Sequence, residues 1–266
     1  SDLDLIVIYD YDPAAIQSTG ERPLAPTQYY SRFTQRMINA MTAPTAEGTL
    51  YEVDMRLRPS GQKGPVATQL ASFVHYQMNE AWTWEHMALT RARVVSGPPP
   101  LKAAIEAAIR DALVQPRDRG KIVADVLDMR GRIEKEKGTA NIWELKQVRG
   151  GLVDLEFIAQ FLQLVHAAAH PEVLDQSTLL AFQKLQRAGL LADDDAEILV
   201  PATRLVHDLT QILRLCFDGP FDPATAPSGL KALLAQAGGE PSFERLEARL
   251  AETLARVAAL FPRLVA

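Results

Sequence analysis

The sequence predicts an α+β protein, with strands near the start of the chain and helices over most of the remainder. Three observations support this prediction. The apolar, β-branched run Leu5–Ile8 is typical of a buried strand. Residues 51–58 alternate between apolar and polar side chains, as a strand with one buried face does. From residue 101 onward, apolar residues recur at helical spacing. We therefore expect a mixed β-sheet domain followed by an all-helical bundle domain.

The opening strand carries two carboxylates at its leading end. Because side chains alternate along a strand, Asp2 and Asp4 project from one face, and Leu3 and Leu5 from the other. Two like charges this close repel each other, and a hard cation or a shared proton relieves the repulsion. A solvated strand end with two unrelated aspartates is the alternative interpretation.

The second strand, 51–58, places Glu52, Asp54, Arg56 and Arg58 on one polar face. If this strand lies beside the first, Asp54 becomes a third carboxylate next to the first two. Three carboxylates with neighbouring arginines suit two Mg²⁺ ions and a nucleoside triphosphate. An ordinary exposed strand would also have a polar face.

Four stretches of the sequence carry a family resemblance. Residues 1–4, Ser-Asp-Leu-Asp, resemble the acidic signature of the nucleotidyltransferase superfamily, which includes DNA polymerase β. Residues 51–61, 79–95 and 145–157 resemble glutamine synthetase adenylyltransferases. Members of that family are bifunctional, with one nucleotidyltransferase half that attaches AMP to a tyrosine of glutamine synthetase and a related half that removes it. The resemblance runs through most of the first 160 residues.

The resemblance implies a nucleotidyltransferase-type domain in which Asp2 and Asp4 hold two Mg²⁺ ions and Asp54 completes the metal site. ATP would be the AMP donor, and pyrophosphate would leave. At a finer level, residues 51–61 and 79–85 look more like the transferase half than the removing half. We therefore expect the C-terminal adenylyltransferase half of such an enzyme, acting on glutamine synthetase, with a PII-type signalling protein as a partner of the full-length enzyme.

Further residues are candidates for binding the nucleotide or its phosphates. Glycines before a helix allow close backbone approach, and the free N–H groups there favour phosphate, although an ordinary loop-to-helix junction has the same pattern. The phosphate-binding candidates are Ser1, Arg56, Arg58, Lys146, Gly150 and Gly151. Residues expected to support the site are Glu52, Glu85, Arg91, Arg93, Asp154 and Glu156, of which the last two, two positions apart, cannot share one helix face.

The remaining elements are predicted from local patterns. Residues 12–26 form a loop, either a flap over the nucleotide or a plain surface loop. Thr27 is expected to cap the helix that follows, and Trp82 and Trp84 to act as packing anchors. The proline-rich stretch 96–100 predicts a boundary between domains 1–96 and 97–266. In the second domain, 143–148 is expected to be extended, and Cys216 to be a core thiol.

Composition narrows the class of protein. With 266 residues, 47% of them hydrophobic, the chain is long enough to bury a substantial core. The formal net charge of -5 provides no global attraction to nucleic acid, so a protein substrate fits better. A single cysteine excludes an intrachain disulfide and, with no membrane-spanning run or signal peptide in the pattern, predicts a cytoplasmic protein. The opening inside a strand motif, without an initiator methionine, predicts a fragment of a longer protein.

Two other functions compete with AMP transfer. The removing half would use the same carboxylates, with inorganic phosphate attacking AMP-tyrosine and ADP leaving. Alternatively, the chain would be a non-catalytic module that docks glutamine synthetase or a PII-type protein. Metal-dependent ATP binding would distinguish the enzymes from the docking module.

Overall fold

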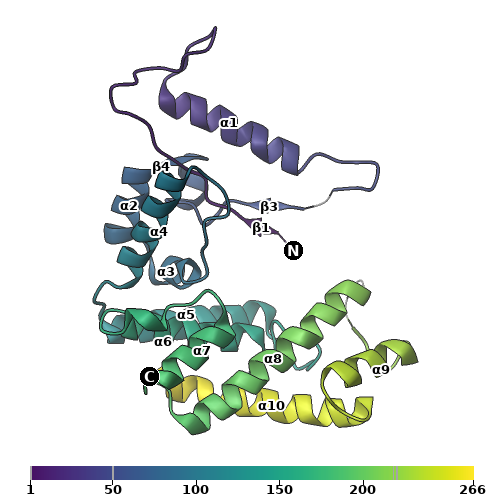
Figure 1. The fold of residues 1–266 in the computed structure, drawn as a ribbon. Coiled ribbons are helices and arrows are strands. Elements are labelled where there is room, and N and C mark those ends of the chain that lie inside the picture. Colours follow the sequence, from purple (N-terminus) through teal and green to yellow (C-terminus); the bar gives the residue numbers. More distant parts are fainter. Residues whose placement is uncertain (1, 50, 218, 220) are drawn as a thin grey trace. The chain divides into compact units, whose positions relative to one another are not determined.

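The strands of the first part of the chain form two short parallel pairs (Figure 1). The computed structural model describes residues 2–49, 51–217, 219 and 221–266. Strand β1 (Leu3–Asp4) pairs with β3 (Val53–Asp54), and β2 (Ile8–Tyr9) pairs with β4 (Thr68–Gln69). The sequence predicted a single opening strand and one mixed sheet. The described residues instead form two separate parallel pairs, so both predictions are wrong. The extended segment changes partner after Leu5, and this exchange divides it into two ladders.

Parallel strands need a long crossover connection, and helix α1 (Pro26–Met41) lies within it. Residues 10–25 precede this helix without regular strand or helix, as predicted. Thr27 does not cap the helix, because Ala25 occupies the N-cap position and Pro26 begins the helix. A proline suits that position, since its missing N–H would have no intrahelical partner there.

Three more helices complete the first part: α2 (Leu70–Asn79), α3 (Thr83–Leu89) and α4 (Pro99–Leu113), with a short 3₁₀ turn at Gly61–Lys63. Phe73 of α2 and Met87 of α3 are buried. Trp82 and Trp84 are 69% and 40% exposed, so the prediction that they anchor the core is wrong. Trp82 precedes α3 and Trp84 lies on its exposed side, which the predicted helical pattern could not distinguish from the side that carries the buried Met87.

The second part of the chain is helical (Figure 1). Its helices are α5 (Arg119–Lys137), α6 (Leu152–His166), α7 (Thr178–Arg187), α8 (Asp193–Cys216), α9 (Ser228–Ala237) and α10 (Phe243–Leu264), with a 3₁₀ turn at Pro171–Val173. Residues 143–148, expected to be extended, form turns instead. Side-chain caps start several of these helices, as where Ser242 accepts a hydrogen bond from the backbone N–H of Arg245.

The core of the helical part surrounds α6. Helices α5, α7 and α10 all pack against α6, and α8 packs against both α7 and α10. Leu155, Ile158 and Phe161 of α6 are fully buried, as are Leu250 and Val257 of α10. Cys216, the last residue of α8, is exposed, so the prediction of a core thiol is wrong. Cys216 continues the apolar stripe of α8 in the sequence, but the end of this helix is exposed, as Leu215 beside it also is.

The chain separates into two compact units. Unit 1 comprises residues 1–88 and 92–112, and unit 2 comprises residues 89–91 and 113–266. Helix α4 therefore groups with the strands, although the proline-rich stretch 96–100 precedes it. The proposed domain limits, 1–96 and 97–266, stay a prediction. No helix in the described ranges combines the length and apolar character needed to cross a bilayer.

Candidate active site

The strand pairing in unit 1 brings two of the predicted carboxylates together. Asp4 and Asp54 are register partners in the parallel β1–β3 ladder. The backbone N–H of Leu3 donates to Glu52 O at 2.8 Å, and that of Leu5 donates to Asp54 O at 2.8 Å. Register partners in a parallel ladder project from the same face. Asp4 therefore lies beside Asp54, and Asp2 precedes it at the spacing of the same face.

The Asp54 carboxylate is held by Arg56, two residues further along the chain. One carboxylate oxygen, Oδ1, accepts from the Arg56 backbone N–H at 2.8 Å, and Oδ2 accepts from Arg56 Nε at 2.6 Å. The Arg56 Nη2 group completes an ion pair with Oδ2. The hydrogen bond from the Arg56 side chain is the main cause that lowers the pKa of Asp54, so this carboxylate stays ionised well below neutral pH.

Arg56 also responds to the other two carboxylates. Its pKa is raised, first by the hydrogen bond and charge of Asp54 and then by the charges of Asp4 and Asp2. The three aspartates and this arginine therefore form one electrostatic group. We call these four residues the acidic cluster. Glu52, expected to support the site, is exposed, and its backbone carbonyl accepts the ladder hydrogen bond from Leu3. Ser1 lies outside the described residues.

Arg58 has a different environment from Arg56, although both belong to the predicted polar face. Its guanidinium donates to three backbone carbonyls: Met55 O at 2.7 Å, Gln62 O at 3.3 Å and Gly64 O at 3.3 Å. These contacts close the loop 55–64 around one side chain. Arg58 thereby shapes the loop after β3, and its role in phosphate binding stays a prediction.

Glu85 of α3 is a buried carboxylate that binds Tyr76 of α2. It is 6% exposed, and Tyr76 OH donates to its two carboxylate oxygens at 2.9 and 3.0 Å. The backbone N–H of Trp82 also donates to Glu85, at 2.9 Å. Burial, then the hydrogen bond with Glu85, raises the pKa of Tyr76, while a backbone hydrogen bond from Ser60 lowers it. The Tyr76 hydroxyl thus connects α2, α3 and the loop after β3.

Removing that hydroxyl should weaken unit 1. We expect Tyr76→Phe to lower the free energy of unfolding by about 1–3 kcal/mol, because the buried Glu85 carboxylate loses a hydrogen-bond donor. Urea denaturation followed by circular dichroism measures the loss. The control is Tyr29→Phe, at a tyrosine that is 44% exposed. Equal stability of the two variants would contradict this account.

In unit 2, the predicted phosphate-binding glycines lie at the start of α6. The Gly150 N–H donates to Asp154 Oδ2 at 2.6 Å, the Gly151 N–H to Val148 O at 2.9 Å, and the Leu152 N–H to Leu145 O at 2.8 Å. The helix start therefore does not offer the free N–H groups on which the phosphate prediction depended. Lys146 is exposed, and its role in phosphate binding, like that of both glycines, stays a prediction.

Close packing explains why position 150 is glycine. Its φ angle is +78°, in the region that disfavours other residues, and an added Cβ would lie 1.9 Å from the Leu254 carbonyl oxygen of α10. At Gly151 a Cβ would lie 2.3 Å from Leu145 O. The glycine pair is required by the approach of α10 and by the turn itself.

Asp154 and Glu156 have separate partners, in agreement with their spacing. Asp154 is fully buried and forms an ion pair with Arg130 of α5, which is 2% exposed. Arg149 adds a second contact to Asp154 at 3.3 Å. Glu156 is paired with Arg91, and Arg93 is exposed in unit 1. Asp154 therefore joins α5 to the start of α6 within unit 2, and its predicted support of the active site stays a prediction.

Comparison with known proteins covers nearly the whole chain. Residues 1–108 match the family model described as glutamate-ammonia ligase adenylyltransferase, and residues 122–265 match the model described as GlnD PII-uridylyltransferase. Over 265 residues the chain is 56% identical to the bifunctional glutamine synthetase adenylyltransferase/adenylyl-removing enzyme of Rhodopseudomonas palustris (strain BisB5). The chain belongs to the glutamine synthetase adenylyltransferase family.

Other members of this adenylyltransferase family match over the same extent. The enzymes with the same name from Bradyrhizobium sp. (strain BTAi1) and Xanthobacter autotrophicus are 54% and 52% identical, and the alignments cover 100% of this chain. The motifs alone indicated a likeness over most of the first 160 residues. The alignments extend this likeness to the whole chain. The chain spans 27% of the length of these curated relatives.

The carboxylates of the acidic cluster match the ligands of a Mg²⁺ site in type. Within the described ranges, no group of three or more Asp, Glu, His or Cys side chains is gathered closely enough to hold a metal ion. The donor chemistry nevertheless fits, because Asp2, Asp4 and Asp54 all supply carboxylate oxygens, and two of them are register partners. The acidic cluster therefore suits Mg²⁺ in the chemistry of its donors, although its carboxylates are not gathered around one point and Arg56 is the partner of Asp54.

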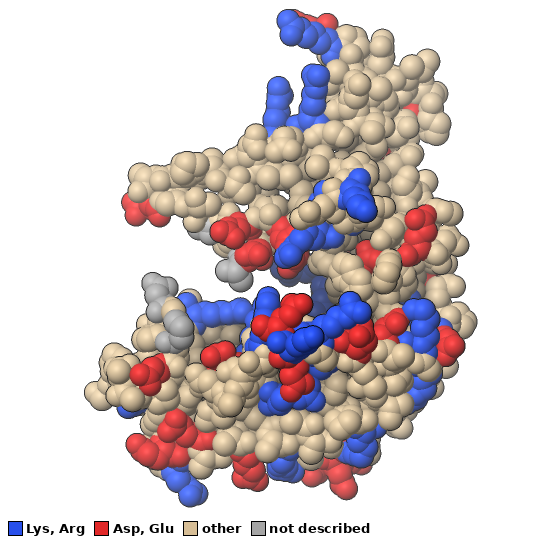
Figure 2. Space-filling model, turned by 180° about the vertical axis from the view of Figure 1, so that it is seen from behind, with Lys and Arg blue, Asp and Glu red and all other residues tan. Residues whose placement is uncertain are grey.

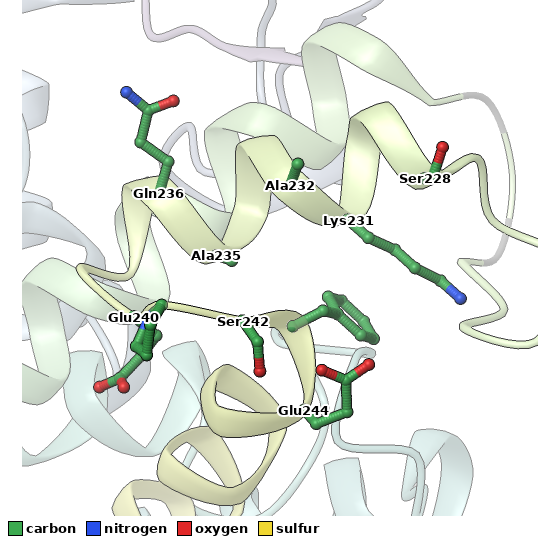
Figure 3. Close-up of a pocket in the computed structure, with 10 residues that line it drawn as sticks. Ser228, Lys231, Ala232, Ala235, Gln236, Glu240, Ser242 and Glu244 are labelled. Atoms are coloured by element: carbon green, nitrogen blue, oxygen red, sulfur yellow. The ribbon is translucent and has the colours of Figure 1, made fainter.

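Two depressions lie elsewhere on this chain. One, of about 470 Å³, lies between α9 and the start of α10, and Lys231 and Glu244 are among the residues that line it (Figure 3). The other, also about 470 Å³, is lined in unit 1 by Asp10, Tyr11 and Asp12 with prolines of the 98–100 stretch. None of the predicted site residues lines either one.

On the face shown in Figure 2, basic and acidic side chains are interspersed over the helical unit, as on an ordinary solvated surface.

Proposed function

We propose that this chain carries the adenylyltransferase half of its family's bifunctional enzyme and transfers AMP from ATP to a tyrosine of glutamine synthetase. The observation that supports this proposal is the register of the β1–β3 ladder, which pairs Asp4 with Asp54. The names of the relatives supply the protein substrate and the two possible directions. The pairing supplies the carboxylates that either direction requires.

The reaction is an in-line displacement. The tyrosine oxygen forms a bond to the α-phosphorus of ATP, the bond from that phosphorus to the bridging oxygen breaks, and pyrophosphate leaves. A phenol is mostly protonated at neutral pH, so a carboxylate of the acidic cluster accepts the hydroxyl proton as the bond forms. Arg56 lies in the same cluster, where a guanidinium suits the oxygens of a phosphate group.

Asp2, Asp4 and Asp54 are the residues that would hold Mg²⁺. When bound, such ions would neutralise the charge of the triphosphate and activate the attacking oxygen. Lys146 and the other basic candidates keep their predicted roles without individual assignment. A cytoplasmic location and a PII-type partner of the full-length enzyme belong to the same proposal.

An assay of direction tests the proposed function. One reaction contains the chain, Mg²⁺, ATP labelled in its α-phosphate, and unmodified glutamine synthetase. The other contains the chain, Mg²⁺, inorganic phosphate and adenylylated glutamine synthetase. We expect labelled AMP on glutamine synthetase in the first reaction and no ADP in the second. An Asp4→Asn chain purified in the same way is the control for contaminating activity.

The opposite result would identify the removing half, because ADP release without AMP incorporation requires phosphate as the attacking group. Absence of both reactions, together with no binding of ATP in the presence of Mg²⁺, would favour the docking module. ATP binding is measured by calorimetry on the same preparation. The three functions therefore give three distinct sets of results.

A further inference from the structure

The Asp54 carboxylate is the most enclosed member of the acidic cluster. Its side chain is 13% exposed, while the side chain of Arg56 that covers it is 70% exposed. Both carboxylate oxygens are engaged, one by the Arg56 backbone N–H and the other by the guanidinium. An ion that approaches Asp54 therefore meets a resident positive charge.

We propose that Arg56 is a displaceable counter-ion, which competes with a divalent cation for the Asp54 carboxylate and leaves it when the cation binds. This inference rests on the proposed function, since it takes Asp54 to be a metal ligand. A guanidinium and Mg²⁺ both seek the same carboxylate oxygens, and they repel each other at short distance. The carboxylate cannot serve both without a loss of affinity for one.

Arg56 is free to move in a way that Arg58 is not. Within the described residues, the hydrogen bonds of the Arg56 side chain go to Asp54 alone, and most of the side chain lies in solvent. Arg58, in contrast, is bound to three carbonyl oxygens of the loop it closes. Rotation of Arg56 breaks its contacts with one carboxylate and leaves the backbone of β3 unchanged.

A released Arg56 remains near the cluster, because its Cα is only two residues from Asp54. Its planar set of N–H donors suits the oxygens of a phosphate group. The same side chain would therefore neutralise Asp54 before the metal binds and meet the nucleotide's phosphates afterwards. The contacts of the Arg56 side chain with Asp54 Oδ2 must break before a cation can take its place.

A Mn²⁺ titration without nucleotide tests the competition directly. Free Mn²⁺ is counted by electron paramagnetic resonance in the presence of the wild-type chain, Arg56→Gln and Lys63→Gln. Lys63 is an exposed lysine of the neighbouring loop, so its variant loses one positive charge without touching Asp54. We expect Arg56→Gln to bind Mn²⁺ at least about fivefold more tightly than wild type, the size of one removed charge repulsion near a surface. Lys63→Gln should change the affinity by less than about twofold.

Two further variants show whether the effect passes through Asp54. Arg56→Lys keeps the charge but loses the planar donors, so its Mn²⁺ affinity should lie between those of wild type and Arg56→Gln. In an Asp54→Asn chain, adding Arg56→Gln should give much less gain in affinity than in the wild-type chain. Circular dichroism confirms folding of each variant, and an unfolded Arg56→Gln chain is replaced by Arg56→Lys.

The results separate this inference from the proposed function. Unchanged or weaker Mn²⁺ binding by Arg56→Gln overturns the inference, even when the wild-type chain binds Mn²⁺ and transfers AMP. Absence of Mn²⁺ binding in every variant overturns it as well. The direction assay judges the proposed function separately. AMP transfer by a folded Asp4→Asn chain would contradict the assignment of Asp4 as a metal ligand, whatever the Mn²⁺ titration of the Arg56 variants shows.

Discussion

Asp4→Asn is expected to reduce AMP transfer by roughly a thousandfold, the usual scale when a divalent-metal ligand is lost. Asp2→Asn should have the same effect. Asparagine keeps the size of the side chain, and both aspartates are exposed, so the melting temperature should change by no more than about 2 °C. Incorporation of labelled AMP and thermal melting are measured on the same preparations.

The matched control is Asp128→Asn in unit 2. Asp128 is an exposed aspartate whose side chain is 60% exposed and pairs with Arg132 at 2.8 Å within one helix. This variant should keep both activity and stability, because such surface pairs contribute little. Transfer near the wild-type rate by a folded Asp4→Asn chain would remove Asp4 from the metal site.

The second large effect concerns stability. Asp154→Ala should lower the free energy of unfolding of unit 2 by about 3–5 kcal/mol, because it leaves a buried cation without its carboxylate. Arg130 is already short of partners, since neither Nη1 nor Nη2 has a hydrogen bond among the described residues. Guanidinium denaturation followed by helical circular dichroism gives the size of the loss.

Asp128→Ala serves as the control here too, with an expected change of no more than about 0.5 kcal/mol. The double variant Arg130→Met, Asp154→Leu should recover part of the lost stability, because apolar side chains of similar volume replace a buried ion pair. The Gly150 N–H, which donates to Asp154, would still lack its acceptor. A loss below about 1 kcal/mol in Asp154→Ala would contradict the role given to the pair.

Much of the site in unit 1 could be predicted from local sequence. Alternation along 51–58 predicted that Asp54 and Arg56 share a strand face, but the strand is only Val53–Asp54 and Arg56 lies in the turn after it. The parallel ladder sets Asp54 beside Asp4. Alternation could not distinguish Arg56 from Arg58. Their difference depends on the turn after Asp54, where Arg58 curls back to the carbonyls of 55–64 while Arg56 stays with the carboxylate.

The helical unit shows where local pattern is insufficient. Glycines at 150 and 151 correctly marked the start of a helix, but Gly150 is required by the approach of Leu254 of α10, which is distant in sequence, and Gly151 by the turn that brings it against Leu145. The pair Arg130–Asp154 was missed for the same reason, since the partners come from different helices. One signal was available: Ile122, Val126 and Arg130 are spaced four apart, so Arg130 continues the buried stripe of α5.

The loop 55–64 has a consequence for how quickly the acidic cluster responds to its ligands. Arg58 fixes three of its carbonyls, Ser60 adopts a left-handed conformation with φ of 60°, and Gly64 has no room for a side chain beside the Pro59 carbonyl. With the backbone fixed in this way, a change of partner at Asp54 needs only a side-chain rotation of Arg56. Exposed side chains rotate in picoseconds to nanoseconds, whereas loops rearrange up to a thousandfold more slowly. Ion exchange at this cluster should therefore be limited by the dehydration of the arriving cation, and a crystal should accept ions by soaking without loss of order.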